Sequence, residues 1–187
     1  MEVEDTSIPD VRLLTVRYFS DHRGYFLETY NKRVVRNLGL TSCFVQDNQS
    51  LSIKRGTIRA LHFQVPPKAQ AKLVRVLRGS IYDVAVDLRA GSPSYGRWMA
   101  MTLTAESDGS CSFRAVARMG TAPSNRTPKW PIRSMSTMRP NSNKALCGDP
   151  TLAIDWPVAP ADAVLSEKDR VLGLFAEFVT PFKYEDR

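Results

Sequence analysis

The stretch that decides the fold runs from Arg55 to Asp87 and reads RGTIRALHFQVPPKAQAKLVRVLRGSIYDVAVD. In its first part, 57–64, apolar and polar residues occur on both faces of a predicted strand, because successive side chains point to opposite faces. A strand with two mixed faces suits a small barrel with a polar interior that holds a ligand. A second apolar run begins at Lys72, a turn follows at 78–80, and a third run comes directly after it.

The remaining chain predicts further short strands joined by turns. Extended segments are expected over 11–19, 25–30, 43–52 and 97–106, and residues 1–10 read as a loose lead-in. A short helix is expected over 32–38, with Asn31 as its N-cap and Gly39 as its C-terminal stop. The pattern predicts an all-β barrel or sandwich.

The C-terminal part predicts a helix. Residues 165–169 read LSEKD and lead into RVLGLFAEF, which suggests a helix that starts after Ser166. The spacing of Ser166 and Asp169 resembles a capping box, although Glu or Gln is the usual partner.

Length and composition predict one domain over 1–187 in the cytoplasm. No segment has the charge and apolar run of a signal peptide, and no apolar stretch approaches the roughly 20 residues that span a bilayer. The chain has only three cysteines, and an odd number cannot all pair within one chain, so a disulfide scaffold is not expected. The small number fits a reducing compartment. We therefore expect no membrane partner.

The net charge of +7 is concentrated in one segment. Residues 107–147 contain seven Lys or Arg and one acidic residue, Asp108, whereas the rest of the chain is close to neutral. This segment has no clear alternation and is rich in Ser, Pro, Thr, Asn and Met. On composition alone it reads as a basic disordered insertion, which is the only support for a nucleic-acid-binding function.

Several motifs together resemble the dTDP-4-dehydrorhamnose 3,5-epimerase family, in the family's order and spacing. They are DHRGYFLETYN (21–31), FVQDNQS (44–50), RGTIRALHFQ (55–64), AKLVRVLRGSIYDVAVDLRAGSPSYG (71–96), and DPTLAIDWP with LSEKD (149–169). The resemblance implies a cupin-like jelly-roll barrel with a few short helices. It also implies a homodimer that binds a dTDP-sugar and uses neither a cofactor nor a metal.

The resemblance implies roles for individual residues. The family abstracts a proton beside the C4 ketone of a sugar nucleotide while a cation or donor holds the developing enolate oxygen. His62 matches the base, Lys72 matches the enolate-stabilising cation, and Asp169 matches the aspartate that orients the histidine and raises its basicity. Alternatively, His62 is a satisfied core histidine, Lys72 a solvated strand charge and Asp169 a helix cap.

The substrate-binding residues implied by the resemblance come from four parts of the chain. They are Arg23, Phe26, Glu28, Gln46, Asp47, Asn48, Arg59 and Lys168. Arginine suits a pyrophosphate because its planar fork matches phosphate oxygens. The alternative is that these polar residues only satisfy backbone groups of the barrel.

Residues 107–147 have the family's length but lack its motifs. A shifted reading frame restores several of them: 111–116 can read L-F-V-P-R-G, 135–141 can read D-E-Y-Y-A-P-E, and Cys147-Gly148 can give Trp. We therefore hypothesise that 107–147 is an out-of-frame translation between two compensating frameshifts, either in the gene or in its recorded sequence. The basic character would then belong to the shifted segment alone.

Because residues 107–147 lack the family's motifs, the chain also lacks the general acid that the family uses. A tyrosine aligns with Ile132, a histidine with Met119, a second tyrosine with Met138 and a glutamate with Asn143, and the shifted frame permits all four. Without the acid, the chain could be an inactive sugar-nucleotide-binding barrel or a product that does not fold.

Two further alternatives concern the chemistry. A 3- or 5-monoepimerase of another dTDP-deoxysugar would keep the same fold and base. A metal site, as in many cupins, is disfavoured because the chain has only His22 and His62, with Gln64 where a second ligand would lie.

Overall fold

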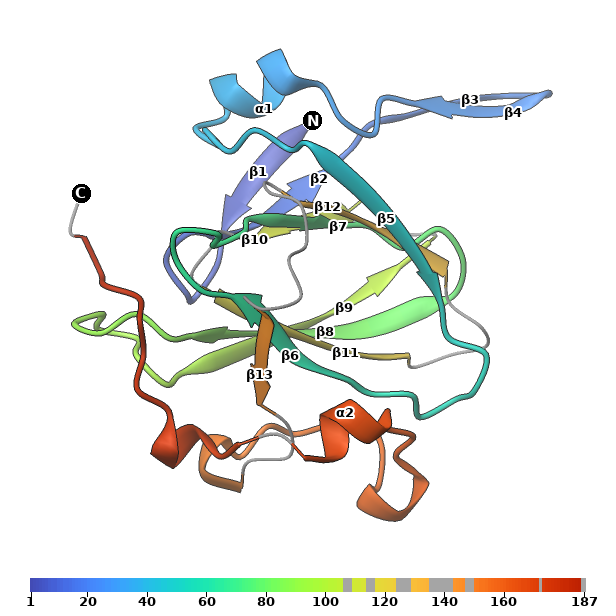
Figure 1. Ribbon diagram of the computed structural model, residues 1–187. Helices are drawn as coiled ribbons and strands as arrows, with labels where there is room; N and C mark the ends of the chain where they lie inside the picture. The colour runs from blue at the N-terminus through green and yellow to red at the C-terminus, as the bar shows by residue number, and fades with distance from the viewer. Residues whose placement is uncertain are drawn as a thin grey trace.

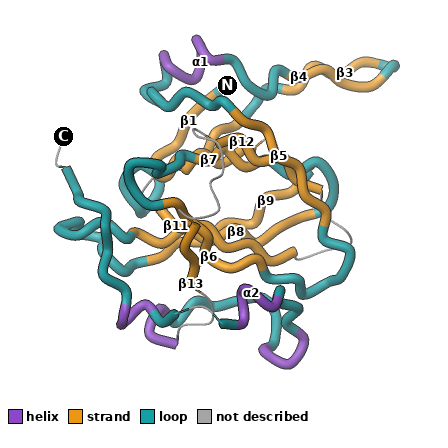
Figure 2. Tube along the Cα trace, viewed as in Figure 1, coloured by secondary structure: helices purple, strands orange, loops and turns teal. Residues whose placement is uncertain are grey.

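The computed structural model describes residues 1–105, 109–113, 117–123, 129–134, 143–146, 150–171 and 173–185. These residues form two β-sheets that face each other, with a hairpin, loops and short helices around them (Figures 1 and 2). Within these ranges, no helix is long and apolar enough to cross a membrane.

The first sheet contains six antiparallel strands. In spatial order they are β1 (Glu2–Asp5), β2 (Val11–Thr15), β10 (Gly109–Phe113), β7 (Lys72–Val74), β12 (Lys129–Ser134) and β5 (Gln46–Leu51). The second sheet contains five antiparallel strands. These are β13 (Asn143–Leu146), β6 (Arg59–Gln64), β11 (Ala117–Pro123), β8 (Ser80–Asp87) and β9 (Trp98–Thr104).

The connections between the strands are those of a jelly roll. From β10 onward, each strand lies in the sheet opposite to that of the strand before it. This alternation closes two antiparallel sheets into a double-layered barrel. The predicted all-β jelly-roll fold is therefore confirmed.

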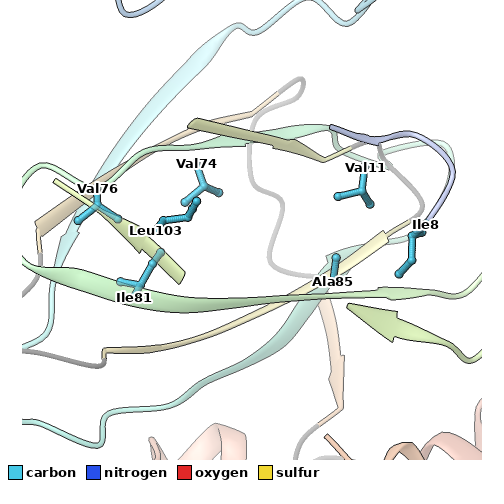
Figure 3. Close-up of a cluster of buried hydrophobic side chains, with 7 residues drawn as sticks. All are labelled: Ile8, Val11, Val74, Val76, Ile81, Ala85 and Leu103. Atoms are coloured by element: carbon cyan, nitrogen blue, oxygen red, sulfur yellow. The ribbon is translucent and has the colours of Figure 1, made fainter. Parts of the chain in front are cut away.

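The hydrophobic core lies in two layers, one on each face of the second sheet. The interior cluster, between the sheets, consists of Ile8, Val11, Val74, Val76, Ile81, Ala85 and Leu103 (Figure 3). The outer cluster consists of Leu61, Phe63, Val84, Val86, Leu88, Leu152 and Phe182. Along β8, residues of the two clusters alternate because a strand presents successive side chains to opposite faces. Burial of each large aliphatic side chain contributes about 1.5–3 kcal/mol to the stability of the folded protein.

Short helices lie outside the sheets. Helix α1 (Lys32–Asn37) begins at Asn31, whose side chain accepts hydrogen bonds from the backbone of Arg33 and Val34, so the predicted N-cap is confirmed. A two-stranded hairpin, β3 (Tyr18–Asp21) and β4 (Gly24–Leu27), projects away from the barrel (Figure 1). The last part of the chain carries η2 (Pro150–Leu152), η3 (Pro160–Asp162), α2 (Glu167–Arg170) and η4 (Phe175–Glu177).

Three predictions from the sequence were wrong. Residues 1–10 are not a loose lead-in, because β1 pairs with β2 at the edge of the first sheet, where its acidic residues suit an edge strand. The described parts of 107–147 are not a disordered insertion, since they supply β10 to β13. The expected helix over 170–178 is also absent among the described residues: α2 ends at Arg170, and only the short η4 follows.

The C-terminal helix is interrupted for two physical reasons. Gly173 lies in the middle of the expected helix, where glycine costs about 1 kcal/mol relative to alanine. Phe175 and Phe178 pack on the outer cluster, and the Phe178 ring meets Phe63 edge-on with ring centroids 5.4 Å apart. Tertiary packing therefore overrides the apolar pattern of this segment.

Candidate active site

The centre of the candidate site is a contact between His62 on β6 and Asp169 on α2. Nε2 of His62 lies 3.0 Å from Oδ1 of Asp169, and that oxygen is buried with no hydrogen-bond partner among the residues that the structure describes. His62 is 45% exposed, whereas Asp169 is 6% exposed. The carboxylate is thus fixed inside the protein, while the imidazole remains accessible to a substrate.

Asp169 makes two contacts at the start of α2, one through its backbone with the N-cap Ser166 and one through its carboxylate with His62. The Oγ of Ser166 accepts a hydrogen bond from the backbone N–H of Asp169 at 3.2 Å, so Ser166 is the N-cap of α2. Because the cap binds the backbone of Asp169, its carboxylate is left available for His62.

A backbone connection holds the segment before α2 against the start of β6. The N–H of Ile58 donates to the carbonyl of Val164 at 3.0 Å, and the N–H of Val164 donates to the carbonyl of Gly56 at 2.9 Å. Gly56 has a φ of +78°, and a Cβ at this position would lie 2.6 Å from the carbonyl oxygen of Asp162. Glycine is therefore required where the two segments meet.

Lys72 on β7 lies beside His62. Its Nζ donates a hydrogen bond to the backbone carbonyl of His62 at 3.0 Å. Burial lowers the pKa of Lys72 to about 8, and the negative charge of Asp83 opposes that shift. A cation therefore lies next to the candidate base, although the two residues are in different sheets.

The amide-rich strand β5 presents alternate residues to this side of the first sheet. Gln46 and Asn48 are half-buried and joined by a hydrogen bond of 2.9 Å from Gln46 Nε2 to Asn48 Oδ1, whereas Asp47 is exposed. In the register of the sheet, Gln46 and Lys72 are both paired with Ser134 on β12. Gln46 and Lys72 thus lie in one cross-strand row.

Arg59 and Lys168 lie on the same two elements as His62 and Asp169. Arg59 begins β6, and its Nη2 donates to the carbonyl of Leu51 at the end of β5 at 3.4 Å. Lys168 is exposed and directly precedes Asp169 on α2.

Three predicted binding residues lie far from His62 within this chain. Arg23 and Phe26 belong to the projecting hairpin, and Glu28 directly follows it (Figure 1). Arg23 is paired with Asp21, Phe26 is 70% exposed, and Glu28 accepts a hydrogen bond from Asn31 at 2.9 Å. The single chain does not bring these residues to the site.

Three of the four positions at which family residues are missing have partners in the strand register. Ile132 is paired with Asn48 and Val74, Met119 with His62, and Asn143 with Gln64. Met138 lies outside the described residues. Position 119 is therefore directly paired with the candidate base, position 143 pairs two residues away from it on β6, and position 132 pairs two residues away from Lys72 on β7.

Sequence reasoning missed Asp83 on β8. This residue is 1% exposed and lies inside an otherwise apolar run, IYDVAV. Burial raises its pKa well above the ordinary value, and the charge of Lys72 opposes that shift. An acid inside a buried strand was the available signal, since charged residues are rarely fully buried without a partner.

No cluster of His, Cys, Asp and Glu in the described ranges is suited to hold a metal ion. The carboxylate of Asp169 and the ammonium group of Lys72 contact His62, the amide of Gln46 lies in the row of Lys72, and the guanidinium of Arg59 comes from the same strand as His62. This arrangement can hold an anionic, hydroxyl-rich ligand and remove a proton from it.

Comparison with known proteins identifies closely similar chains. A family model described as dTDP-4-dehydrorhamnose 3,5-epimerase matches residues 5–177. A dTDP-4-dehydrorhamnose 3,5-epimerase from Pseudomonas aeruginosa is 40% identical over 179 residues, which cover 95% of this chain and 97% of the relative.

Two solved structures also match. A dTDP-6-deoxy-D-glucose-3,5-epimerase from Legionella pneumophila, in complex with dTDP-4-keto-L-rhamnose, has a TM-score of 0.91, 32% identity and coverage of 99% of both chains. A 3'-monoepimerase from Streptomyces bikiniensis, in complex with dTDP-quinovose, has a TM-score of 0.84 and 28% identity, covering 91% of this chain and 86% of that chain.

Proposed function

Because this chain belongs to the dTDP-4-dehydrorhamnose 3,5-epimerase family, we propose that it inverts C3 and C5 of dTDP-4-dehydro-6-deoxy-D-glucose. The product is dTDP-4-dehydro-L-rhamnose, and the reaction belongs to dTDP-L-rhamnose biosynthesis. The observation that carries the proposal is the His62–Asp169 contact, with the Lys72 ammonium bonded to the backbone of the same histidine.

The proposed base is His62. A neutral imidazole that donates its Nε2–H to Asp169 has its lone pair on Nδ1, and this atom accepts the proton from the carbon beside the ketone. The electrons of the broken C–H bond move into the enolate, whose oxygen gains negative charge. Lys72 stabilises that oxygen as a cation, so the base and the electrophilic group are on facing sheets.

The substrate-binding groups follow from the same arrangement. We assign Gln46, Asp47 and Asn48 to the substrate, and Arg59 and Lys168 to its anionic or hydroxyl groups. Arg59 already bridges β6 and β5, which supports a place for its guanidinium between the base and the amide strand. Bidentate binding of phosphate oxygens by arginine favours the pyrophosphate as its partner.

The proposed acid depends on the reading frame of 107–147. We propose that the natural protein has a tyrosine at the position of Ile132 and that the segment is frameshifted between two compensating changes. The pairing of Ile132 with Asn48 and Val74, beside the Lys72 row, supports this position for an acid opposite His62. Intact mass with peptide mapping of 107–147 decides the question directly.

Each mass has a defined consequence for activity. The shifted-frame mass predicts full epimerisation, with deuterium from solvent incorporated at both C3 and C5. The mass of the printed sequence predicts a chain without its acid, for which loss of general-acid catalysis costs about 10²–10⁴ in rate. If a protein with the shifted-frame mass binds the substrate but incorporates no deuterium, the epimerase proposal is wrong.

We also propose a homodimer in which the hairpin of one copy reaches the other copy. Support comes from the hairpin itself, which leaves the barrel and exposes Phe19, Tyr25 and Phe26. A mixture of His62→Ala and Arg23→Ala proteins should regain activity if each site uses Arg23 of the other copy. Light scattering should show two chains, and a monomer with full activity would contradict the proposal.

A second candidate is a monoepimerase, favoured by the match to the Streptomyces bikiniensis 3'-monoepimerase. Deuterium incorporation at only one of the two carbons would identify it. For either activity we propose a cytoplasmic enzyme that needs no metal or cofactor and binds no nucleic acid.

A further inference from the structure

Asp83 is a buried carboxylate that the proposed reaction does not use. It lies on β8 between Ile81 and Ala85, two residues of the interior cluster, so its side chain points between the two sheets. The side chain is 1% exposed, and neither carboxylate oxygen has a hydrogen-bond partner in the described part of the chain. A buried charge in this state is strongly unfavourable unless another charge compensates it.

Lys72 supplies that compensation from the facing sheet. It lies two residues from Val74 on β7 and therefore shares the face that Val74 turns toward the interior cluster. Burial lowers the pKa of Lys72 and raises the pKa of Asp83, and in each case the charge of the other residue opposes the effect of burial. The two residues thus stabilise each other's charged form across the interior.

The other titratable groups around Lys72 are already engaged. His62 on β6 accepts the Lys72 hydrogen bond with its backbone carbonyl, and Asp169 on α2 contacts the imidazole of His62. The residues paired with Lys72 in the first sheet, Phe113 and Ser134, have no group that titrates near neutral pH. Among the described residues, Asp83 is therefore the anion that faces Lys72.

We propose that Asp83 is a positioning residue that keeps Lys72 protonated and directed toward the sugar. The proposal rests on the proposed function, in which the Lys72 ammonium holds the enolate oxygen. Asp83 acts through Lys72 because its own oxygens are inaccessible from the surface. A neutral lysine at this place would leave the developing oxygen charge without its cation.

The first test measures the protonation of Lys72 without turnover. Lysines are dimethylated with ¹³C-formaldehyde, the Lys72 resonance is assigned with Lys72→Arg, and its titration is followed by NMR in wild type and Asp83→Asn. We expect the Lys72 midpoint to fall by about 1 pH unit or more, because a nearby opposite charge shifts a pKa by about 1–3 units. The descending alkaline limb of kcat/KM should move by the same amount.

Asp87→Asn is the matched control. Asp87 is on the same strand and the same face as Asp83 and is equally buried, but it is paired with Arg89. Its replacement should destabilise the protein without moving the Lys72 midpoint. An unchanged midpoint in Asp83→Asn, or equal shifts in both variants, overturns the proposal.

A double-mutant cycle of melting temperatures tests the same pair without chemical modification, in case dimethylation of the lysines disturbs the site. Asp83→Asn, Lys72→Met and the double variant are compared with wild type, and we expect the double variant to lose less in Tm than the sum of the single losses. Additive losses overturn the proposal. If the protein proves not to be an epimerase but the midpoint still shifts, the proposed function fails while the electrostatic pair stands.

Discussion

His62 and Asp169 meet through Nε2 and Oδ1 at 3.0 Å, and Asp169 is held at both its backbone and its side chain. Ser166 fixes the backbone N–H of Asp169, and the buried Oδ1 has the imidazole of His62 as its ion-pair contact. An oxygen buried without a partner is costly, so the geometry favours one orientation of the imidazole.

Asp169→Asn should lower kcat by about 10²–10⁴-fold, the range associated with general acid–base catalysis. An amide can keep the shape of the side chain but cannot stabilise the positive charge that His62 acquires with the proton. Steady-state kinetics measures the loss, with circular dichroism as a check on folding. Ser166→Ala is the control: it should cost about 1 kcal/mol of stability and leave most of the activity, because it removes only the cap.

Ile132→Tyr should raise epimerisation by about 10²–10⁴-fold if the chain carries isoleucine at this position. The added phenol would protonate the enolate on the face opposite His62. The assay follows deuterium incorporation and product configuration by NMR. Ile132→Phe supplies the ring without the hydroxyl, and equal activity of the two variants would rule out a role as acid.

Gly56→Ala should destabilise the protein and also lower kcat. Alanine at φ +78° is strained, and its Cβ would lie 2.6 Å from the carbonyl oxygen of Asp162, so the segment that leads to Asp169 must shift. Gly39→Ala is the control, because Gly39 has φ +82° and nothing within 4 Å of the added Cβ. It should cost about 1–2 kcal/mol from backbone strain alone and leave kcat unchanged.

The activity should fall as pH rises through about 8, because the pKa of Lys72 is lowered to about 8 by burial and the enolate requires the charged form. The pH profile of kcat/KM measures this limb. Arginine stays charged throughout the pH range of the assay, so any activity that remains in Lys72→Arg should not fall as pH rises through about 8. An alkaline limb at the same pH in Lys72→Arg would assign it to another group.

Asp87 should make folding stability sensitive to acid. Burial alone would raise the pKa of Asp87, but hydrogen bonds from Arg89, Ser92 and Ser94 outweigh burial and lower it. Since the folded value lies below the unfolded one, the stabilisation is complete above about pH 4 and is lost as pH falls through the folded value.

Denaturant unfolding of Asp87→Asn tests this sign. Breaking the buried pair with Arg89 should cost about 3 kcal/mol at pH 7, since Asp10 still binds Arg89. The difference from wild type should shrink below about pH 4. A difference that stays constant down to pH 2 would contradict the assignment to Asp87.

Most of the barrel was predictable because its strands carry local signals. The run after Lys72, the turn at 78–80 and the apolar run of β8 identify their strands without tertiary information. The N-cap at Asn31 was predictable for the same reason, since a cap depends on neighbouring backbone groups. The contact between Asp169 and His62, by contrast, came only from the family resemblance.

The errors have a common physical origin in packing between distant segments. β1 is stabilised by its pairing with β2, although its own residues are mostly acidic. The segment around Gly173 contains apolar residues because Phe175 and Phe178 pack on the outer cluster. Their spacing resembles the apolar face of a helix, so the sequence predicted a helix there. Asp83 escaped notice because its partner is in another sheet.

The connection between Gly56 and Val164 has a consequence for biosynthesis of the protein. His62 is translated early and Asp169 late. The two backbone hydrogen bonds of Val164, with Gly56 and Ile58, hold the two segments together and therefore need both of them. A nascent chain that has emerged only as far as residue 164 has every strand of the barrel and yet lacks the contact between His62 and Asp169. The base would therefore gain its carboxylate only when the segment from Val164 to Asp169 emerges, so the emergence of this segment also times the first possible turnover.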